Sequence, residues 1–131
     1  MEIHLDEKYI VGCIYRHPNG NIEHYTKAVF ATHGKIRDKL PILISGDINI
    51  DLTKSWEPRI RKYIDSLFEL GFLPTITIPT RITDETQTLI DHIYIRSSKK
   101  LNDKVIRSGV LYSDVTDHLP IFVIISNGKK M

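Results

Sequence analysis

Residues 40–52, LPILISGDINIDL, constrain the fold of this chain more than any other stretch. The stretch opens with branched apolar side chains, which are typical of a strand covered on both faces. It then places Asp47, Asn49 and Asp51 at alternate positions. Side chains two apart on a strand share a face, so these three are expected on one side. We therefore predict a buried strand over 42–48 that leads into a polar strand end.

Around this strand, the first half of the chain alternates between helix and strand patterns, whereas strand patterns dominate the second half. Helical spacing of apolar residues predicts a helix over 22–39 with Asn21 as its N-cap, and a second helix from a Ser55 cap to Gly71. The predicted buried stripe of the second helix is Trp56, Ile60, Tyr63 or Ile64, and Leu67. The other predicted strands are 8–16, 75–83, 88–96, 104–112 and 120–126.

Length and composition fit one soluble globular domain, residues 1–131, of mixed α/β or α+β class with helices packed on a sheet. The chain is 41% hydrophobic and 26% charged, and its net charge of +2 permits a polyanionic partner without requiring one. The single Cys13 lies in an apolar run and is expected to pack as a small hydrophobe in the reducing nucleus or cytoplasm. No membrane segment is expected. His33 and His92 are expected to be packed or structural.

The polar strand end has a simple structural interpretation, because Asp and Asn often bond the local backbone in turns. Two sharper alternatives fail on spacing. A calcium loop starting at Asp47 would need glycine where Leu52 stands and glutamate where Pro58 stands. A nucleotide hydrolase would need a glycine-rich phosphate loop, which the sequence lacks, so no nucleotide cofactor is expected. A serine-hydrolase elbow is absent too.

Three other strand ends carry similar polar groups, which raises the odds of a functional site. Tyr15 ends the first strand, and Asp91 interrupts the apolar run LIDHIYI, where a lone carboxylate is costly unless paired. Asp117 and His118 come immediately before the last strand. A buried acid and a separate histidine are the ingredients of a base that a carboxylate holds in one tautomer.

In this order, these motifs resemble the endonuclease/exonuclease/phosphatase superfamily, and most closely the endonuclease domains of LINE-type (non-LTR) retrotransposons. The resemblance implies part of a four-layer α-β-β-α sandwich, with mixed, mostly antiparallel sheets and two helices on the outer face. The matching motifs are IYRHPN (14–19), SGDINIDL (45–52), PTRIT (79–83), LIDHIYI (89–95) and TDHLPI (116–121).

The resemblance also implies catalytic roles. Asp47 would orient or activate the attacking water, and Asn49 would hold that acid and the phosphate. His118 would contact a non-bridging phosphate oxygen, with its other ring nitrogen bonded to Asp91. Tyr15 would contact the phosphate through its hydroxyl. These residue types suit phosphodiester hydrolysis, which needs a positioned water and donors for the developing charge.

By the same resemblance, Asp117 would help to position the metal ion, and Asn19 and Arg81 would contact the nucleic-acid backbone. An oxygen-rich site suits Mg²⁺ or Mn²⁺ rather than zinc. The family's Asn and metal-binding Glu motifs of the first half are not visible before Tyr9. The chain therefore resembles the C-terminal portion of the domain, and we expect weak metal binding and impaired catalysis.

The expected function is that of a metal-dependent DNA endonuclease of retrotransposon type, with DNA as partner. The alternative is a non-catalytic remnant that folds by self-association or by pairing with a missing N-terminal half. Half of a two-sheet sandwich would leave apolar surface exposed, which usually finds a partner. Such a remnant would at most bind nucleic acid.

Overall fold

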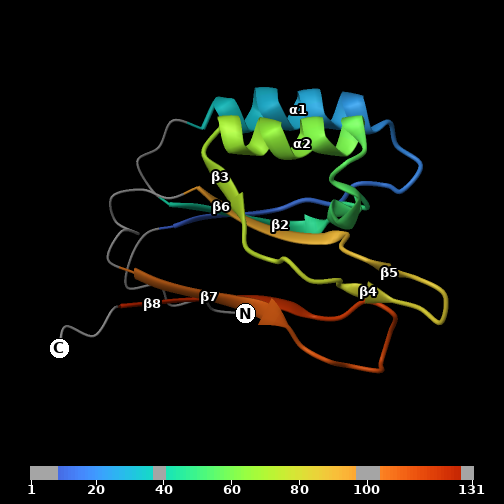
Figure 1. Ribbon diagram of the computed structural model, residues 1–131. Helices are drawn as coiled ribbons and strands as arrows, with labels where there is room; N and C mark the ends of the chain where they lie inside the picture. Colours follow the sequence, from blue (N-terminus) through green and yellow to red (C-terminus); the bar gives the residue numbers. More distant parts are fainter. Residues whose placement is uncertain (1–8, 37–40, 97–103, 128–131) are drawn as a thin grey trace.

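The computed structural model describes residues 9–36, 41–96 and 104–127, and Figure 1 shows how their elements are arranged. The helices within these ranges are α1 (Ile22–Gly34), the short 3₁₀ helix η1 (Leu52–Lys54) and α2 (Pro58–Glu69). The strands within these ranges are β1 (Ile10–Cys13), β2 (Ile42–Asp47), β3 (Phe72–Pro74), β4 (Arg81–Ile82), β5 (Gln87–Thr88), β6 (Asp91–Arg96), β7 (Lys104–Val110) and β8 (Ile121–Asn127).

The first helix begins as predicted and ends earlier. The Asn21 side chain accepts a hydrogen bond from the His24 N–H at 2.9 Å, which confirms the predicted N-cap. The helix ends at Gly34 rather than at residue 39, because glycine is a poor helix former and the Lys35 N–H turns back to carbonyls of the last turn. Residues 37–39 of the predicted helix lie outside the described residues.

The second helix starts later than predicted. Glu57 is its N-cap and Pro58 its first residue, so the predicted Ser55 cap is wrong. Proline favours the first helical position and forces the residue before it into an extended conformation, which fixes this start. Trp56 therefore lies before the helix and is exposed, so its predicted place in the buried stripe is wrong. Gly71, at φ +83°, closes the helix as predicted.

The rest of the stripe is buried as predicted, and its members are Ile60, Tyr63, Ile64 and Leu67. The predicted strand over 75–83 is mostly wrong, since only Arg81–Ile82 is a strand there. Pro79 interrupts that stretch. The sequence also did not predict β3 (Phe72–Pro74), while β1 is shorter than the predicted 8–16. Strands β2, β7 and β8 fall where strands were predicted, to within a residue or two, and β6 starts three residues later than the predicted strand over 88–96.

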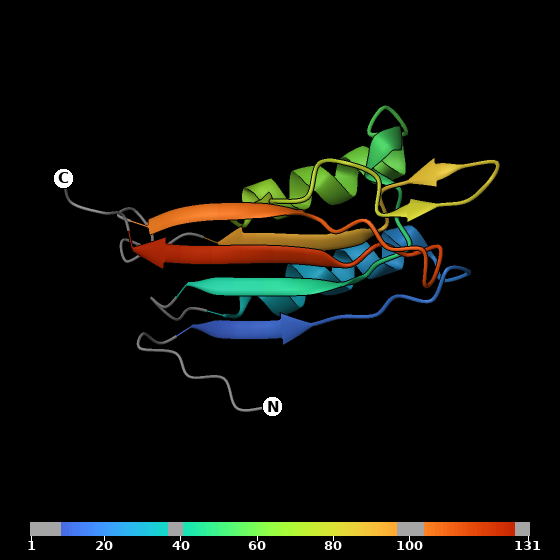
Figure 2. The same cartoon turned by 90° about the horizontal axis from the view of Figure 1, so that it is seen from below.

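The described elements form three layers. Strands β1-β2-β6-β3 make a sheet in which only the β1–β2 pair is parallel, as α1 joins those two strands. Both helices cover one face of this sheet, and the antiparallel β7–β8 pair covers the other (Figures 1 and 2). The observed architecture confirms a mixed α+β fold with mostly antiparallel sheets and two helices on an outer face.

Two apolar clusters hold the layers together. The larger lies between the helices and the sheet, with Ile42, Tyr63, Phe72 and Tyr94 at its centre. The smaller lies between the two sheets and is built on Ile76, Leu89 and Ile93, with half-buried neighbours from β2, β7 and β8. The sandwich is therefore best packed on its helical side.

Two buried histidines belong to this packing, as predicted. His33 lies 3.3 Å from the Tyr94 hydroxyl, and His92 lies 3.2 Å from the Tyr63 hydroxyl. Burial lowers the pKa of both imidazoles, so both are neutral at pH 7. The predicted burial of Cys13 is wrong, because this residue of β1 is exposed.

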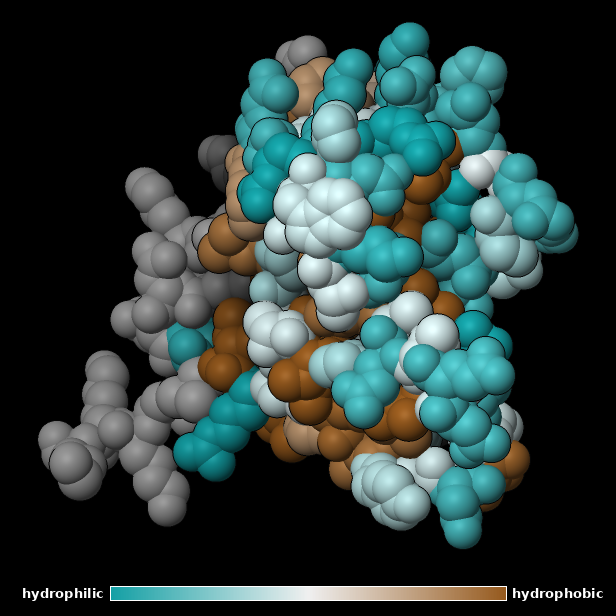
Figure 3. Space-filling model, turned by 45° about the vertical axis from the view of Figure 1, so that its right-hand side comes forward, coloured by the Kyte–Doolittle hydropathy of each residue, from teal (hydrophilic) through white to brown (hydrophobic). Residues whose placement is uncertain are grey.

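The two halves of the surface differ in polarity. Figure 3 shows a mainly hydrophilic helical layer above, and more apolar side chains over the β7–β8 sheet below. Of the helices that the structure describes, none has the length and apolar character needed to span a bilayer.

Candidate active site

Two carboxylates meet at the end of the four-stranded sheet. Asp47 ends β2, Asp91 begins β6, and the two residues are direct partners across this antiparallel pair. Side chains of directly paired residues lie on the same face. That face is the one toward the β7–β8 sheet, because Leu43 and Ile93 precede and follow these acids at even spacing and pack in the second cluster. Folding thus places two acids side by side under the second sheet.

His118 comes to the two acids from the connection between β7 and β8. Its Nδ1 lies 3.0 Å and 3.3 Å from the two carboxylate oxygens of Asp91. The backbone holds the histidine there, because residue 118 bridges to Arg81 and the Leu119 N–H donates to the Thr80 carbonyl at 2.6 Å. The predicted pairing of His118 with Asp91 is therefore present in the structure.

The surroundings of Asp47 disfavour the charged form of its carboxyl group. Burial raises the pKa of its carboxyl group, and the facing charge of Asp91 raises it further. His118, the backbone N–H of Asn49 and Arg81 act in the opposite direction and lower that pKa. One oxygen, Oδ1 of Asp47, is buried and has no hydrogen-bond partner among the described residues. A buried oxygen without a donor is the kind of group that a cation or a bound water satisfies.

Asp47, Asp91 and His118 offer three ligand atoms that all lie within 4.8 Å of one another. Two carboxylate oxygens and an imidazole nitrogen suit a divalent cation, and the two facing acids supply the negative charge to attract it. The donor set and the unpartnered Asp47 oxygen therefore fit a metal ion. They do not determine which metal it is.

Asn49 is not on a strand, although the sequence pattern predicted that it would share a strand face with Asp47. Strand β2 ends at Asp47, and Asn49 adopts a left-handed conformation with φ +52°. The alternation that placed Asp47, Asn49 and Asp51 on one face therefore does not apply. The Asn49 Nδ2 donates to the Arg16 carbonyl at 2.7 Å, while the guanidinium of Arg16 donates back to the Asn49 carbonyl at 3.1 Å. Two reciprocal hydrogen bonds thus hold Asn49 to Arg16, in the segment that follows β1.

Asp51 has the structural role of an acid in a turn. Its carboxylate caps η1 by accepting from the Thr53 N–H and hydroxyl, and it also accepts from the Leu89 N–H. It is not one of the three grouped ligands.

Tyr15 lies on the same side of the sheet as Asp47. The ladder between β1 and β2 continues past Cys13, since the Ile14 N–H donates to Ser45 and the Arg16 N–H donates to Asp47. Alternation along this extension places Tyr15 on the Asp47 face, one strand away, with 66% of its side chain exposed. Its contact with a phosphate stays a prediction. Asn19 is exposed in the turn that follows, and its role stays a prediction too.

Asp117 and Arg81 form an ion pair with each other. The Arg81 Nε lies 2.7 Å from the Asp117 carboxylate, and both side chains are substantially exposed. This hydrogen bond lowers the pKa of Asp117. Asp117 lies outside the group of three ligands described above. Its predicted metal role, and the predicted nucleic-acid contact of Arg81, remain predictions.

Two further residues support the site: Thr80, which was not singled out from the sequence, and Arg16, which was expected only as a polar residue at the end of the first strand. Thr80 is completely buried, and its hydroxyl accepts from the N–H groups of Ile90 and Asp91 at 3.2 and 3.0 Å. Its carbonyl accepts from Leu119, so Thr80 connects the Asp91 strand with the His118 segment. Arg16 is also buried, and its guanidinium donates to the carbonyls of Asn49 and Gly20. Both lie inside quoted motifs, but spacing alone gives no sign of these long-range bonds.

Comparison with known proteins identifies the fold. Neither a protein-family model nor a curated protein matches the chain. Among solved structures, the endonuclease domain of TRAS1, a telomere-specific non-LTR retrotransposon, matches with a TM-score of 0.62 at 20% identity, covering 86% of this chain and 53% of that domain.

Two bacterial structures of the endonuclease/exonuclease/phosphatase family match as well. The protein from Leptotrichia buccalis has a TM-score of 0.53 at 16% identity, covering 77% of this chain and 42% of its own. The protein from Bacteroides thetaiotaomicron has a TM-score of 0.52 at 17% identity, covering 82% and 45%. The chain spans about half the length of these structures. Over that span it has the endonuclease/exonuclease/phosphatase fold.

Proposed function

We propose that the site at the sheet end is a phosphodiester hydrolysis site, and that the chain is the C-terminal part of a metal-dependent DNA endonuclease of the retrotransposon type. One observation carries this proposal, namely the grouping of Asp47, Asp91 and His118, from three separate segments, within 4.8 Å. The resemblance of the motifs and the match to the TRAS1 endonuclease domain support the choice of reaction and of DNA.

We infer the roles of the three residues from the resemblance, and their contacts support these roles. The raised pKa of Asp47 suits a carboxylate that accepts the proton of the attacking water. The water oxygen forms the new bond to phosphorus while the bond to the leaving sugar oxygen breaks, and solvent protonates that oxygen. When the His118 ring carries both protons, Nδ1–H stays on Asp91 and Nε2–H donates to a non-bridging phosphate oxygen.

A divalent ion, Mg²⁺ or Mn²⁺, would be held by the carboxylates of Asp47 and Asp91, whereas Asp117, a metal ligand by the resemblance, is paired with Arg81. When bound, such an ion neutralises negative charge on the phosphate and polarises the reacting oxygens. Two acids without further charged ligands make a weak site, because affinity follows the number of charged ligands. We therefore propose activity that is impaired relative to that of a full-length domain.

A plasmid-nicking assay tests this function. Supercoiled DNA is incubated with Mn²⁺ or Mg²⁺ and with the chain, its Asp47→Ala form or its His118→Ala form. We expect slow nicking that each substitution lowers by at least about 100-fold. Asp114→Ala, which removes an exposed acid from the same connection, is the matched control and should nick like the parent. Nicking that survives both site substitutions would rule the proposal out.

Metal binding has an independent readout. Mn²⁺ should raise the melting temperature of the parent chain, by an amount set by ligand concentration over dissociation constant. The shift should disappear in Asp47→Ala and persist in Asp114→Ala. An equal shift in all three proteins would place the ion elsewhere.

A second candidate function is a non-catalytic module that pairs with another chain, a copy of itself or the missing half of the domain. An apolar groove of about 210 Å³ favours it, lined by Tyr9, Val11 of β1, Leu43 of β2, and Val123 and Ile125 of β8. Such a groove between two sheets is where another strand would fit. A concentration-dependent dimer in sedimentation, together with no nicking under any metal, would favour this function over the first.

A further inference from the structure

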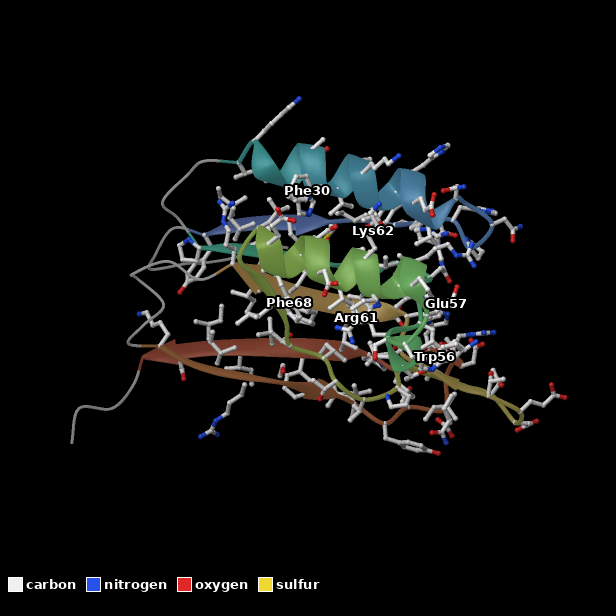
Figure 4. The ribbon with its side chains drawn as sticks, turned by 45° about the horizontal axis from the view of Figure 1, so that its top comes forward. Phe30, Trp56, Glu57, Arg61, Lys62 and Phe68 are labelled. Atoms are coloured by element: carbon white, nitrogen blue, oxygen red, sulfur yellow. The ribbon has the colours of Figure 1, made fainter. Side chains whose placement is uncertain are left out.

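Trp56 is exposed, whereas a tryptophan in a small domain is usually packed in the core. It is the only tryptophan of the chain, and 77% of its side chain is exposed. It stands between η1 and α2, and Figure 4 shows it with Glu57 and Arg61 at the end of α2 nearest η1. Leaving so large an apolar group in water forgoes the burial energy that an aromatic ring otherwise provides. An exposed tryptophan therefore points to a contact with a ligand.

The segment that carries Trp56 is anchored to the candidate active site. The Leu52 N–H donates to the Leu89 carbonyl at 3.0 Å, and the Leu89 N–H donates to the Asp51 carboxylate at 3.0 Å. Leu89 is two residues before Asp91. Figure 1 shows η1 and the start of α2 at the same end of the molecule as the β4–β5 pair. A strand of nucleic acid whose phosphate entered the site could therefore continue over this segment.

The same segment concentrates positive charge. Residues 54–62, KSWEPRIRK, hold four basic residues and one acid, whereas the whole chain has a net charge of only +2. Arg59 is paired with Glu57 at 2.8 Å, and Arg61 lies 3.7 Å from Asp65. Lys54 is exposed two residues before Trp56, and the Arg61 Nε donates to the Ser55 carbonyl at 3.2 Å, whereas Lys62 lies on the side of α2 that faces α1 (Figure 4). A positively charged surface combined with an exposed aromatic ring is a pattern by which proteins bind single-stranded nucleic acid.

We propose that residues 54–61 form a second nucleic-acid contact surface, on which Trp56 stacks against an unpaired base of the DNA strand whose phosphate enters the site. This inference rests on the proposed function, because the phosphate site sets the path of the strand. It also narrows the substrate class, since a small sugar phosphate or inositol phosphate offers no base to stack.

Fluorescence of the single tryptophan tests the inference directly. The chain is titrated, in EDTA so that no cleavage occurs, with a thymidine oligonucleotide of about 12 nucleotides, a length within the usual range for such surfaces. The matched probe is an abasic strand of the same length, which keeps the phosphates and lacks the bases. We expect saturable quenching by the thymidine strand and little quenching by the abasic strand or by inorganic phosphate. Equal quenching by both strands would overturn the proposal.

Substitutions give the second arm, read by anisotropy of a labelled oligonucleotide. Trp56→Ala should weaken binding by about 5- to 150-fold, the range expected for one stacked base, and Trp56→Phe should recover part of the loss. Because Trp56 is outside the core, both variants should keep the parent's circular dichroism. Phe68→Ala removes another exposed aromatic, which Figure 4 shows farther along α2, and should bind like the parent. Parent-like binding by Trp56→Ala would overturn the proposal.

The two proposals fail in different ways. If the Asp47→Ala variant no longer nicks DNA but the thymidine strand still quenches its tryptophan fluorescence, both proposals stand. If the Asp47→Ala variant nicks DNA like the parent, the proposed hydrolytic function is wrong. The comparison of thymidine and abasic strands then decides the stacking proposal by itself. A blunt duplex should quench less than the single strand, because its bases are already stacked, and equal quenching by the duplex would count against stacking on an unpaired base.

Discussion

Asp91 and His92 are neighbours in β6 that point to opposite faces of the sheet, and their surroundings differ sharply. On the helical face, the His92 Nε2–H donates to the Ile50 carbonyl at 2.9 Å and Nδ1 accepts from the Tyr63 hydroxyl at 3.2 Å. On the other face, Asp91 lies beside a second acid, Asp47, whose buried Oδ1 has no partner among the described residues. The helical face is built for stability, whereas the face under β7–β8 keeps unsatisfied charge, which a bound ligand would compensate.

Among truncations of apolar side chains, the largest effect should come from the helical face. Phe72→Ala deletes a fully buried ring from the main cluster and should lower the free energy of unfolding by about 3–5 kcal/mol. Val123→Ala, in the half-buried cluster between the sheets, should cost only about 1 kcal/mol. Urea denaturation measures both. Equal losses would show that the two faces contribute alike.

The next effect tests the Thr80 hydroxyl, which accepts hydrogen bonds at the start of β6. Thr80→Val keeps the shape of the side chain but leaves the N–H groups of Ile90 and Asp91 without their acceptor. We expect a loss of about 1–3 kcal/mol in unfolding free energy, and reduced nicking because Asp91 loses its anchor. Thr77→Val, at an exposed position, is the control and should leave both quantities unchanged.

A smaller effect concerns the facing acids. Because the pKa of Asp47 is raised in the folded chain, the native state binds its proton more tightly, and stability falls as pH rises from about the unfolded value of 3.8 through the folded one. Asp47→Asn should abolish that fall and stabilise the chain at neutral pH by about 1 kcal/mol or less. Melting temperatures between pH 3 and 8 measure it.

Asp117→Asn should change the pH dependence of stability in the opposite direction, measured over the same pH range. Its lowered pKa gives a contribution that is present above the unfolded value and is lost as pH falls through the folded one. The Asn variant should therefore lose part of the acid-dependent destabilisation. Two variants with the same pH dependence would contradict this assignment of charges.

The smallest effect lies at the uncovered edge of the second face. Val11 is 57% exposed and lines the groove, so Val11→Lys should change the unfolding free energy by no more than about 0.5 kcal/mol. Ile44→Lys, on the helical face of the neighbouring strand, should prevent stable folding because it buries an unpaired charge. Cys13, exposed in the same strand as Val11, should react with a thiol reagent in the native chain.

Several parts of this fold could be predicted from local chemistry. Asn21 caps α1 because its side-chain oxygen can accept a hydrogen bond from a free N–H of the first helical turn. Ile42–Asp47 forms a strand because its β-branched residues favour a buried strand. The errors fall where two local signals compete. Ser55 is a good cap residue, but Pro58 fixes the start of α2, and that shift moves Trp56 from the core to the surface.

The sequence by itself determined which residues could do chemistry: two acids at strand ends, a histidine before the last strand, and the order of motifs that indicated the fold. Only the tertiary structure decided that Asp47 faces Asp91, that Asp117 turns to Arg81, and that Thr80 connects the segments of the site. Strand register and long-range hydrogen bonds join residues tens of positions apart, and periodicity along the chain carries no information on such pairs.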